Sequence, residues 1–542
     1  MMQGKNLDLK KMRTEAIPVI DHVANQFGLR NILQEVLGNT RHVDALEILV
    51  KNVLMTRSAL YRIEEWASSF DPKLMSGGQV NDDLLARALD RLYASDRASL
   101  QTRCVLAAVK TFGVDTSTIH NDSTSVSLDG IYDDQNLKAV QLKRGHSKDH
   151  RPDLKQLVYS LSVAADEAIP VHFKVYDGNR TDDTTHQETW LTLRGLLGKS
   201  DFLYVADCKL CTEENMAAID RNQGRFVTIV PQSRKETKVF ADAVLKSDVR
   251  WQPLWRKRSR RDSESDDCFE IAVGLWQLRE GYAIHWYRST EKMRRDAENR
   301  DERINETMEK LSALSAPGRR GPKSEKTLLK AAQQIVHKYG ADNWIVPTVT
   351  TEAIETYRQL TRGRSSSTVT YRKVMKKRAC LTWVTDEAAI AASKATDGIF
   401  PLTTNTELPP LDVLKHYKYQ PRIEKRFAFL KSVTAVAPVF LKKNQRVEAL
   451  MFVYFLATLL AALVERELRR AMAAANVKVI HTLPEERPTS TPTWEQITRL
   501  FSNLARYELR DGKHMVRVFA DQTNSPQKQV LLLLGISEAV FK

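Results

Sequence analysis

The chain has 542 residues, of which 42% are hydrophobic and 27% charged, and these proportions exclude a disordered protein. The length exceeds what one hydrophobic core usually organises, so we expect several structural units. The formal net charge of +15 predicts a polyanionic partner, with DNA or RNA as the first candidate. A basic surface that only aids solubility would give the same charge.

The five cysteines are too few for a disulfide scaffold and fit a reducing cytosol. Cys208 and Cys211 have redox or zinc spacing, but no second pair completes a zinc site, so we expect no metal there. The first 13 residues contain no apolar segment typical of a secretory signal. Residues 449–464 are apolar but shorter than the ~20 residues that cross a bilayer, so they predict a buried core helix and no membrane partner.

Residues 1–113 predict a helical N-terminal domain. Apolar residues recur there at spacings of three and four, and the expected helices span 17–37, 42–53, 81–92 and 98–112. Helical units before a basic enzyme core often bind DNA, and we expect that role. No helix-turn-helix pattern stands out, so a domain that only packs against the core stays open.

Residues 114–235 predict the first half of an α/β core. The expected order is three strands, a helix, a strand, a helix and a strand. In chain order these elements span 114–128, 156–165, 170–176, 185–197, 202–206, 213–220 and 225–230. This order is typical of a ribonuclease-H-like mixed sheet flanked by helices.

Residues 236–395 predict a large basic insertion of mixed strands and helices. Two strands are expected at 268–276 and 282–288, followed by a helix over 290–314, further helix, and a basic strand-like stretch at 368–377. A basic run flanked by Trp251 and Trp255 is expected to bind phosphates. Its cations are Arg256, Lys257, Arg258, Arg260 and Arg261. The tryptophans either stack on bases or form hydrophobic cover.

The second half of the core is expected over 396–475, with a strand at 397–402 and a helix that carries Glu424. Residues 476–542 predict a C-terminal linker and a small mixed appendage.

Three carboxylates fall where a ribonuclease-H-like sheet could bring them together. Asp122 lies in the first strand, Asp207 directly follows the fourth, and Glu424 lies on the later helix. The first and fourth strands are neighbours in such a sheet, so the aspartates should face each other. Each residue alone could be a turn residue or an ion-pair partner, but together they predict a site for two Mg²⁺ or Mn²⁺ ions that cuts phosphodiesters. We interpret His120, on the same face of the strand as Asp122, as a core histidine rather than a metal ligand.

At these residues the sequence resembles the DDE transposases of bacterial insertion sequences, in the branch marked by Y-x2-R-x3-E-x6-K. Tyr417, Glu424 and Lys431 match that register, and Gln420 stands at the arginine position. Arg422 could supply the missing charge, but it lies on a different helical face. The resemblance extends to Asp122-Ser123-Thr124, to Asp207, and to the stretches at 145–149 and 397–402.

The resemblance implies an enzyme that binds terminal inverted repeats, frees a 3′-hydroxyl and joins it to target DNA. It also implies catalytic and metal-binding roles for Asp122, Asp207 and Glu424, DNA contacts from Tyr417, Gln420 and Lys431, and a synaptic homodimer in the bacterial cytoplasm at the nucleoid. Such enzymes carry a β-rich insertion, for which the 217 residues between Asp207 and Glu424 leave room. Two alternatives stay open: a nuclease without strand transfer, and a DNA-binding protein without catalysis.

Overall fold

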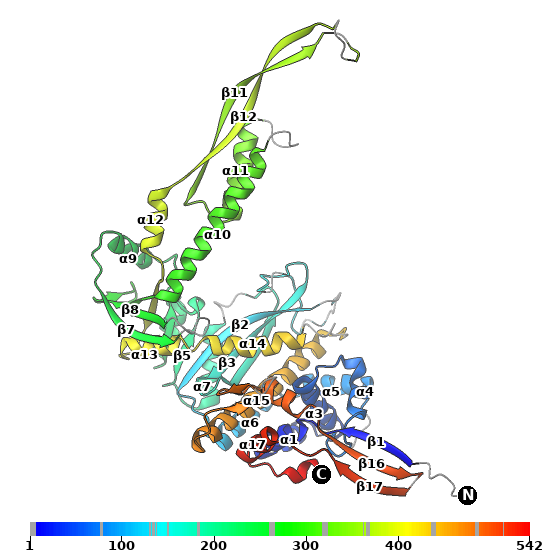
Figure 1. The fold of residues 1–542 in the computed structure, drawn as a ribbon. Coiled ribbons are helices and arrows are strands. Elements are labelled where there is room, and N and C mark those ends of the chain that lie inside the picture. The colour runs from blue at the N-terminus through cyan, green and yellow to red at the C-terminus, as the bar shows by residue number, and fades with distance from the viewer. Residues whose placement is uncertain are drawn as a thin grey trace. The chain divides into compact units, whose positions relative to one another are not determined.

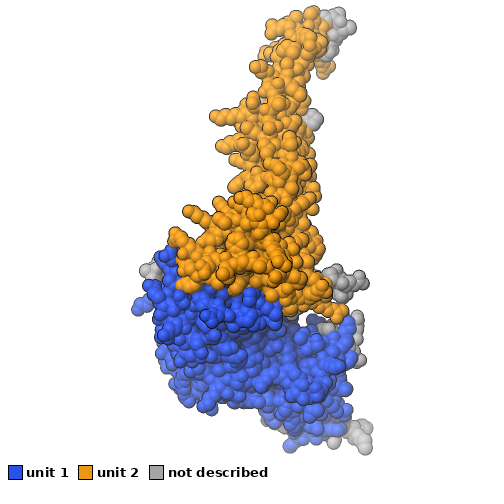
Figure 2. Space-filling model, turned by 90° about the vertical axis from the view of Figure 1, so that its left-hand side faces the viewer, with its two compact units in different colours: residues 1–228, 404–542 blue, residues 229–403 orange. Residues whose placement is uncertain are grey.

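The computed structural model divides the chain into two compact units, residues 1–228 with 404–542 and residues 229–403 (Figures 1 and 2). Each unit is described separately below. The residues described are 7–38, 40–75, 80–128, 132, 136, 138–148, 151–180, 185–258, 266–316, 324–360, 362–364, 369–434, 441–482, 487–512 and 514–542.

The sheet at the centre of unit 1 has the strand order β4-β3-β2-β5-β6. Its strands are β2 (Thr118–Leu128), β3 (Lys155–Ala164), β4 (Ile169–Asp177), β5 (Leu203–Ala206) and β6 (Arg225–Ile229). β2, β3 and β4 pair antiparallel, whereas β2, β5 and β6 pair parallel. This mixed order is the expected ribonuclease-H-like one. Nine of the eleven residues of β2 are buried, as in a strand covered on both faces.

Helices surround this sheet. α7 (His186–Leu197) and α8 (Glu213–Arg221) connect its parallel strands, and η3 (Cys208–Leu210) follows β5. α13 (Pro410–Tyr417) and α14 (Pro421–Thr434) precede the long helix α15 (Asn444–Ala474). α14 packs against β2, and α15 packs against β4.

α15 is long and apolar enough to cross a membrane, but 94% of its most apolar window is buried inside the protein. The helix therefore forms the core of unit 1, as the sequence predicts.

The N-terminal helices pack around this core helix, since α1, α3 and α5 all contact α15. The bounds are α1 (Ile17–Gln26), α2 (Leu29–Leu37), α3 (Thr40–Met55), η1 (Leu60–Arg62), α4 (Ile63–Ser68), α5 (Asp82–Ala94) and α6 (Arg97–Phe112). The single helix expected over 17–37 is wrong. Gly28 adopts the left-handed region at φ 72° and separates α1 from α2.

The two ends of the described chain share a three-stranded sheet of order β1-β16-β17. Its strands are β1 (Leu7–Arg13), β16 (Ala505–Asp511) and β17 (His514–Ala520). The indole of Trp494 also donates a hydrogen bond to the carbonyl of Leu54 at 2.8 Å. Other elements of this region are β14 (Ile480–His481), β15 (Pro488–Thr489), α16 (Trp494–Phe501), α17 (Ser525–Leu533) and η5 (Glu538–Phe541). The C-terminal segment is thus built into the N-terminal region.

Unit 2 contains strands in the order β13-β10-β8-β7, with β9 paired to β10. Their bounds are β7 (Trp251–Arg258), β8 (Asp266–Ala272), β9 (Trp276–Gln277), β10 (Ala283–Ser289) and β13 (Ile399–Thr404). The helices are α9 (Lys235–Leu245), α10 (Thr290–Ser315), α11 (Glu325–Lys338) and α12 (Glu387–Ala395).

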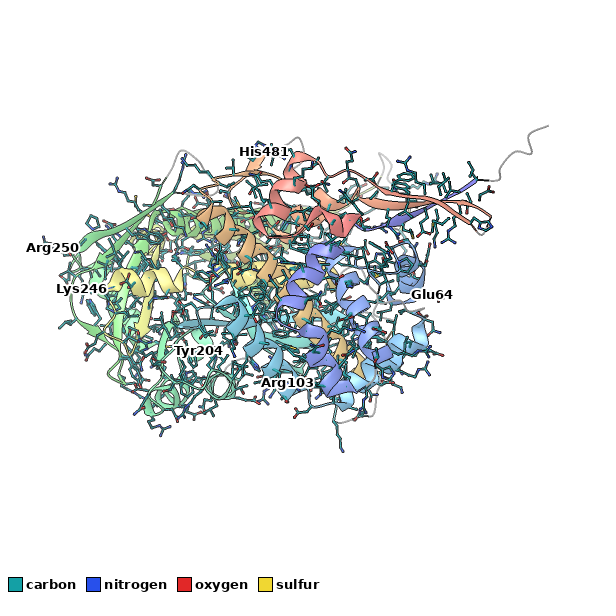
Figure 3. All side chains as sticks on the ribbon, turned by 90° about the horizontal axis from the view of Figure 1, so that it is seen from below. Glu64, Arg103, Tyr204, Lys246, Arg250 and His481 are labelled. Atoms are coloured by element: carbon teal, nitrogen blue, oxygen red, sulfur yellow. The ribbon has the colours of Figure 1, made fainter. Side chains whose placement is uncertain are left out.

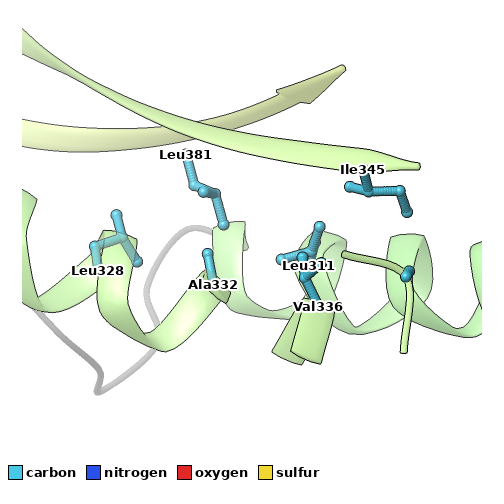
Figure 4. Packing of buried hydrophobic residues seen from close by; sticks show 7 residues of the cluster. Leu311, Leu328, Ala332, Val336, Ile345 and Leu381 are labelled. Atoms are coloured by element: carbon cyan, nitrogen blue, oxygen red, sulfur yellow. The ribbon is translucent and has the colours of Figure 1, made fainter. Parts of the chain in front are cut away.

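β11 (Ile345–Gln359) and β12 (Tyr371–Thr385) form a separate two-stranded ribbon that extends beyond α11 (Figure 1). A small apolar core holds the base of the ribbon against α10 and α11 (Figure 4). Its buried members include Leu311 from α10, Leu328 from α11, Ile345 from β11 and Leu381 from β12. The sequence predicted part of β12 but took the β11 region as helix, so that expectation is wrong.

Candidate active site

Two predicted aspartates meet at the carboxyl end of the parallel strands of unit 1. β2 and β5 pair with Thr118 beside Leu203 and His120 beside Val205. The same offset places Asp122 beside Asp207. Asp122 Oδ1 accepts a hydrogen bond from the Ser123 N–H at 2.7 Å. Asp207 caps η3 and accepts from the Lys209 N–H at 3.1 Å, so both carboxylates are held by local backbone.

A lysine lies against this aspartate pair. Lys148 Nζ is 3.7 Å from Asp122 Oδ1 and also bonds to the carbonyl of Ser123. The Lys148 backbone N–H donates to Ser125 Oγ at 2.8 Å, which fixes the residue over β2. The ammonium therefore compensates negative charge at the strand ends.

A histidine approaches Asp207 from inside the unit. His186, the first residue of α7, is buried, and its Nε2 lies 3.8 Å from Asp207 Oδ1. Its Nδ1 lies 3.1 Å from the hydroxyl of Tyr204, a buried residue of β5 (Figure 3). Burial opposes ionisation of Asp207, but His186, the Lys209 N–H and the Lys148 charge more than offset it, and its pKa lies below the ordinary value.

Glu424 lies in the first turn of α14, the helix that packs against β2, and its side chain is exposed. Glu424 and the two aspartates all influence the hydroxyl of Tyr417, the last residue of α13. Burial and the negative charges of Asp207, Asp122 and Glu424 together raise the pKa of the Tyr417 hydroxyl well above its ordinary value. All three carboxylates therefore act electrostatically on one tyrosine.

The three carboxylates do not close into a compact ligand set. Across the part of the chain that the structure describes, no three His, Cys, Asp or Glu side chains are near enough to share one metal ion. The structure thus puts Asp122 and Asp207 on neighbouring strands and Glu424 on the helix that packs against β2.

The segment before Glu424 is anchored to β2. Gln420 Oε1 accepts from His120 Nδ1 at 3.2 Å, and Gln420 Nε2 donates to the Asn121 carbonyl at 3.3 Å. The ring of Tyr419 stacks on His120 with centroids 4.9 Å apart. His120 is fully buried, and burial lowers its pKa to about 4 despite the bond with Gln420. His120 is thus the core histidine that the sequence predicts, and the Gln420 amide points to the strand beneath the site.

Arg426 ties α14 to its surroundings from the buried side of the helix. Its guanidinium lies 2.8 Å from Glu465 of α15 and also donates to the carbonyls of Glu167 and Ala168 in the β3–β4 turn. Both charged side chains are 9% exposed. Glu465 also accepts from the Trp494 N–H at 2.9 Å. The pair therefore fixes the helix that presents Glu424.

The Y-x2-R-x3-E-x6-K register spans two helices rather than one. Tyr417 ends α13, α14 begins at Pro421, and Lys431 lies half-buried in the last turn of α14. The residues of this register lie in unit 1.

The basic run of the insertion lies on β7 in unit 2. Arg256 and Arg258 are exposed, while Lys257 and Arg258 pair across the strands with Asp267 and Asp266. Arg260 and Arg261 fall outside the described residues. Trp255 stacks on Phe269 at 5.3 Å, and the ring of Phe240 meets Trp251 at 6.1 Å. Both tryptophans are used in packing within the unit.

Three site residues went unassigned from sequence: His186, Lys148 and Arg426. Lys148 falls in the 145–149 stretch that carries the resemblance, which was the available signal. His186 lies 21 positions before Asp207, a separation with no recognisable spacing. From sequence alone Arg426 resembles a solvent-exposed helix cation, because its partner Glu465 lies on the distant helix α15.

A sheet of order β4-β3-β2-β5-β6, with one aspartate inside β2 and another directly after β5, defines a ribonuclease-H-like class of protein. Residues 117–460 match the family described as "Transposase DDE domain". The chain therefore belongs to this transposase family and is a DNA transposase that binds DNA.

Among solved structures, the chain is similar to the piggyBac transposase in its synaptic complex with hairpin DNA. The two are 9% identical, the match covers 61% of this chain and 67% of that one, and the TM-score is 0.30. The comparison with curated proteins gives no match.

Proposed function

We propose that Asp122, Asp207 and Glu424 are the catalytic carboxylates of a metal-dependent transposase of the insertion-sequence branch. The enzyme would cut DNA at transposon ends and transfer the freed 3′-hydroxyl to target DNA. The observation that carries the proposal is the parallel pairing of β2 with β5, which puts Asp122 and Asp207 on neighbouring strands under the helix that carries Glu424. These residues come from β2, the end of β5 and α14, so only the folded chain assembles them.

The donor set fits hard divalent cations. Carboxylate oxygens are the ligands that Mg²⁺ and Mn²⁺ prefer, and the neighbours of Asp207 lower its pKa, which favours the charged form. The Lys148 ammonium already lies beside Asp122, which supports a site suited to positive charge. Asp122, Asp207 and Glu424 would hold two ions, which when bound activate a water or 3′-hydroxyl and stabilise the leaving oxygen.

The surrounding residues hold this site in place. The His186–Tyr204 pair supports Asp207 from the interior, while Gln420 and Arg426 hold α13 and α14 on the sheet. The exposed carboxylate of Glu424 is open to DNA from solvent. We assign DNA contacts to Tyr417 and Lys431 in unit 1 and to Arg256, Lys257, Arg258, Arg260 and Arg261 in unit 2. Gln420 is not assigned a DNA contact, because both ends of its amide bond to β2. Two copies would act together on paired ends.

The test is cleavage of labelled duplexes that carry the ends of the element, with purified full-length protein and Mg²⁺. Asp122→Asn, Asp207→Asn and Glu424→Gln should each abolish cleavage, while Glu214→Gln, an exposed acid on α8, should cut like the parent. Strand transfer is measured separately with pre-cut ends and a target plasmid.

Cleavage that survives Glu424→Gln would remove that residue from the site. Cleavage without strand transfer would favour a nuclease, and DNA binding without cleavage by the parent would favour a non-catalytic protein. Protein mass with and without DNA ends reports whether the active species is a dimer.

A further inference from the structure

The β11–β12 ribbon of unit 2 is long and mostly uncovered. Its strands pair without a break from Ile345 beside Thr385 to Gln359 beside Tyr371. Fifteen residues per strand correspond to about 50 Å at roughly 3.3 Å per residue. The apolar core at the base uses Ile345 and Leu381, with Val349, Ala379 and Trp383 packed against it. Beyond this core, residues 352–359 and 371–378, here the distal ribbon, extend without a covering element.

The distal ribbon is strongly basic. Six cations stand against Glu352 and Glu355, all of them exposed: Arg358, Arg372, Lys373, Lys376, Lys377 and Arg378. Arg362 and Arg364 add two more at its tip. Lys373 pairs with Glu355, whereas the other five form no ion pair with any described residue. This surface therefore presents positive charge that the chain itself does not compensate.

The charge is arranged by face. Side chains alternate along a strand, and the pairing register puts Arg358, Arg372, Lys376 and Arg378 on the same face of the ribbon. Lys373 and Lys377 lie on the other face. Arg358 lies directly across from Arg372 in the pairing register, and like charges at such paired positions are unfavourable without a bound anion.

An isolated two-stranded ribbon is only marginally stable in water. The distal ribbon also exposes Tyr357, Tyr371 and Met375, which are 66%, 43% and 57% accessible. Apolar and cationic groups together on an uncovered strand pair indicate a surface that is completed by a partner. A second copy of the same ribbon would bring like charges together, so its charge favours a polyanion.

We propose that the distal ribbon is an arm that binds duplex DNA, with Arg358, Arg372, Lys376 and Arg378 contacting backbone phosphates. A two-stranded ribbon fits the width of a major groove, about 12 Å. The inference extends the DNA binding of this transposase to a surface outside the three carboxylates, and it stands whether or not those carboxylates are catalytic.

The test is the affinity of the full chain for a fluorescent duplex in EDTA, so that cleavage plays no part. The triple variant Arg372→Ala/Lys376→Ala/Arg378→Ala should weaken binding at least about 10-fold. The slope of log affinity against log salt should fall by about 0.9 for each lost phosphate contact, so by nearly 3. The matched control is Lys326→Ala/Lys330→Ala/Lys338→Ala, which removes three exposed cations from α11 of the same unit.

A second variant guards against misfolding. Replacing residues 354–376 by Asn-Gly joins Ala353 to its partner Lys377 and leaves every residue of the basal apolar core in place. It removes Arg358, Arg372 and Lys376 and keeps Arg378, so it should lose salt-dependent affinity at least as large as the triple variant loses and keep the parent's thermal transition. An equal loss of DNA affinity in the α11 control would show that only the net charge of the protein matters, and it would overturn the proposal. Unchanged DNA affinity with altered self-association would identify a protein partner and overturn it as well.

Discussion

The strands of the unit 1 sheet and the ribbon of unit 2 use charge in opposite ways. Along β2 nearly every side chain is buried, and the carboxylates of β2 and of the β5 end each have a neighbouring basic side chain, Lys148 beside Asp122 and His186 beside Asp207. Along the distal ribbon the side chains are exposed and five of six cations form no ion pair with a described residue. A buried sheet can hold a few charges accurately, whereas an exposed ribbon offers many charges that adapt to a partner.

The largest expected effect tests whether the unit 1 sheet determines the cleavage rate while exposed cations determine the DNA affinity. Asp207→Asn should lower cleavage at least about 1000-fold, equivalent to about 4 kcal/mol of barrier, because under the proposed function it removes a charged metal ligand. Its DNA affinity in EDTA should stay within about 2-fold of the parent, since affinity depends mainly on cations. Single-turnover cleavage and equilibrium binding on one protein preparation check both values. A large loss of DNA affinity would show that the carboxylate region contributes to binding as well as to cleavage.

The next effect concerns a buried cation against exposed ones. Arg426→Ala leaves the buried Glu465 with only the guanidinium of Arg469, 3.7 Å away, and should lower the free energy of unfolding by about 3 kcal/mol. Arg422→Ala, on the exposed side of the same helix, should cost less than about 1 kcal/mol, as should Arg372→Ala on the ribbon. Denaturant unfolding measures all three. Equal losses for Arg426 and Arg422 would contradict the anchoring role of the buried pair.

A smaller effect follows from histidines buried in unit 1. Burial lowers the pKa of His120 and of His172 from 6.5 to about 4. Between these values the unfolded chain takes up protons that the folded chain does not. The unfolding free energy should therefore fall by about 1.4 kcal/mol per pH unit for each histidine as pH drops from 6.5 to 4. The His172→Asn variant should therefore lose about 1.4 kcal/mol per pH unit from the slope of unfolding free energy against pH, measured by denaturant unfolding at several pH values.

The ribbon provides the contrast for that measurement. β11 and β12 contain no histidine, so the part of the DNA affinity lost in the ribbon triple variant should not change between pH 6.5 and 8. A pH-dependent difference would place titrating groups in the ribbon interface.

The smallest effect is expected at Lys148. Its ammonium lies beside Asp122 and would compete with a metal ion for that carboxylate. Lys148→Met should tighten Mn²⁺ binding by no more than about 5-fold, because the pair is partly exposed and weak. It should also raise the pKa of Asp207. Lys143→Met, which removes the partner of Asp177, is the charge-matched control. Weaker Mn²⁺ binding than in this control would show that Lys148 supports the ion instead.

Much of the unit 1 sheet was predictable because its strands carry their own pattern. The strand ending before Asp207 and the one containing Asp122 were found from short apolar and β-branched runs, and their adjacency follows from strand order. The Glu424 helix was found from a residue register. What local pattern could not supply was the packing partner of each residue, such as Glu465 for Arg426 or His186 for Asp207, because these pairs form only when distant segments meet.

The β11 strand was missed for a different reason. Its sequence, IVPTVTTEAIETYRQ, alternates β-branched and polar residues, but it directly follows a helical region and contains helix-favouring Glu and Ala. The pairing with β12 along fifteen residues overrides that local preference. The break at Gly28 was equally hidden, because the apolar period continues across it from α1 into α2.

The pairing of β1 with β16 determines how long β1 stays without its partner strand during translation. Arg13 lies beside Ala505, so the first strand waits for a partner about 490 residues further along. At roughly 5–20 residues per second, translation leaves that edge open for on the order of half a minute or more. During this time Leu7 and Leu9 of β1 have no partner strand beside them. Both side chains are about half exposed even in the folded protein. Until β16 is made, the edge of β1 is open to other strands, and a chaperone that shields this edge should raise the yield of active protein.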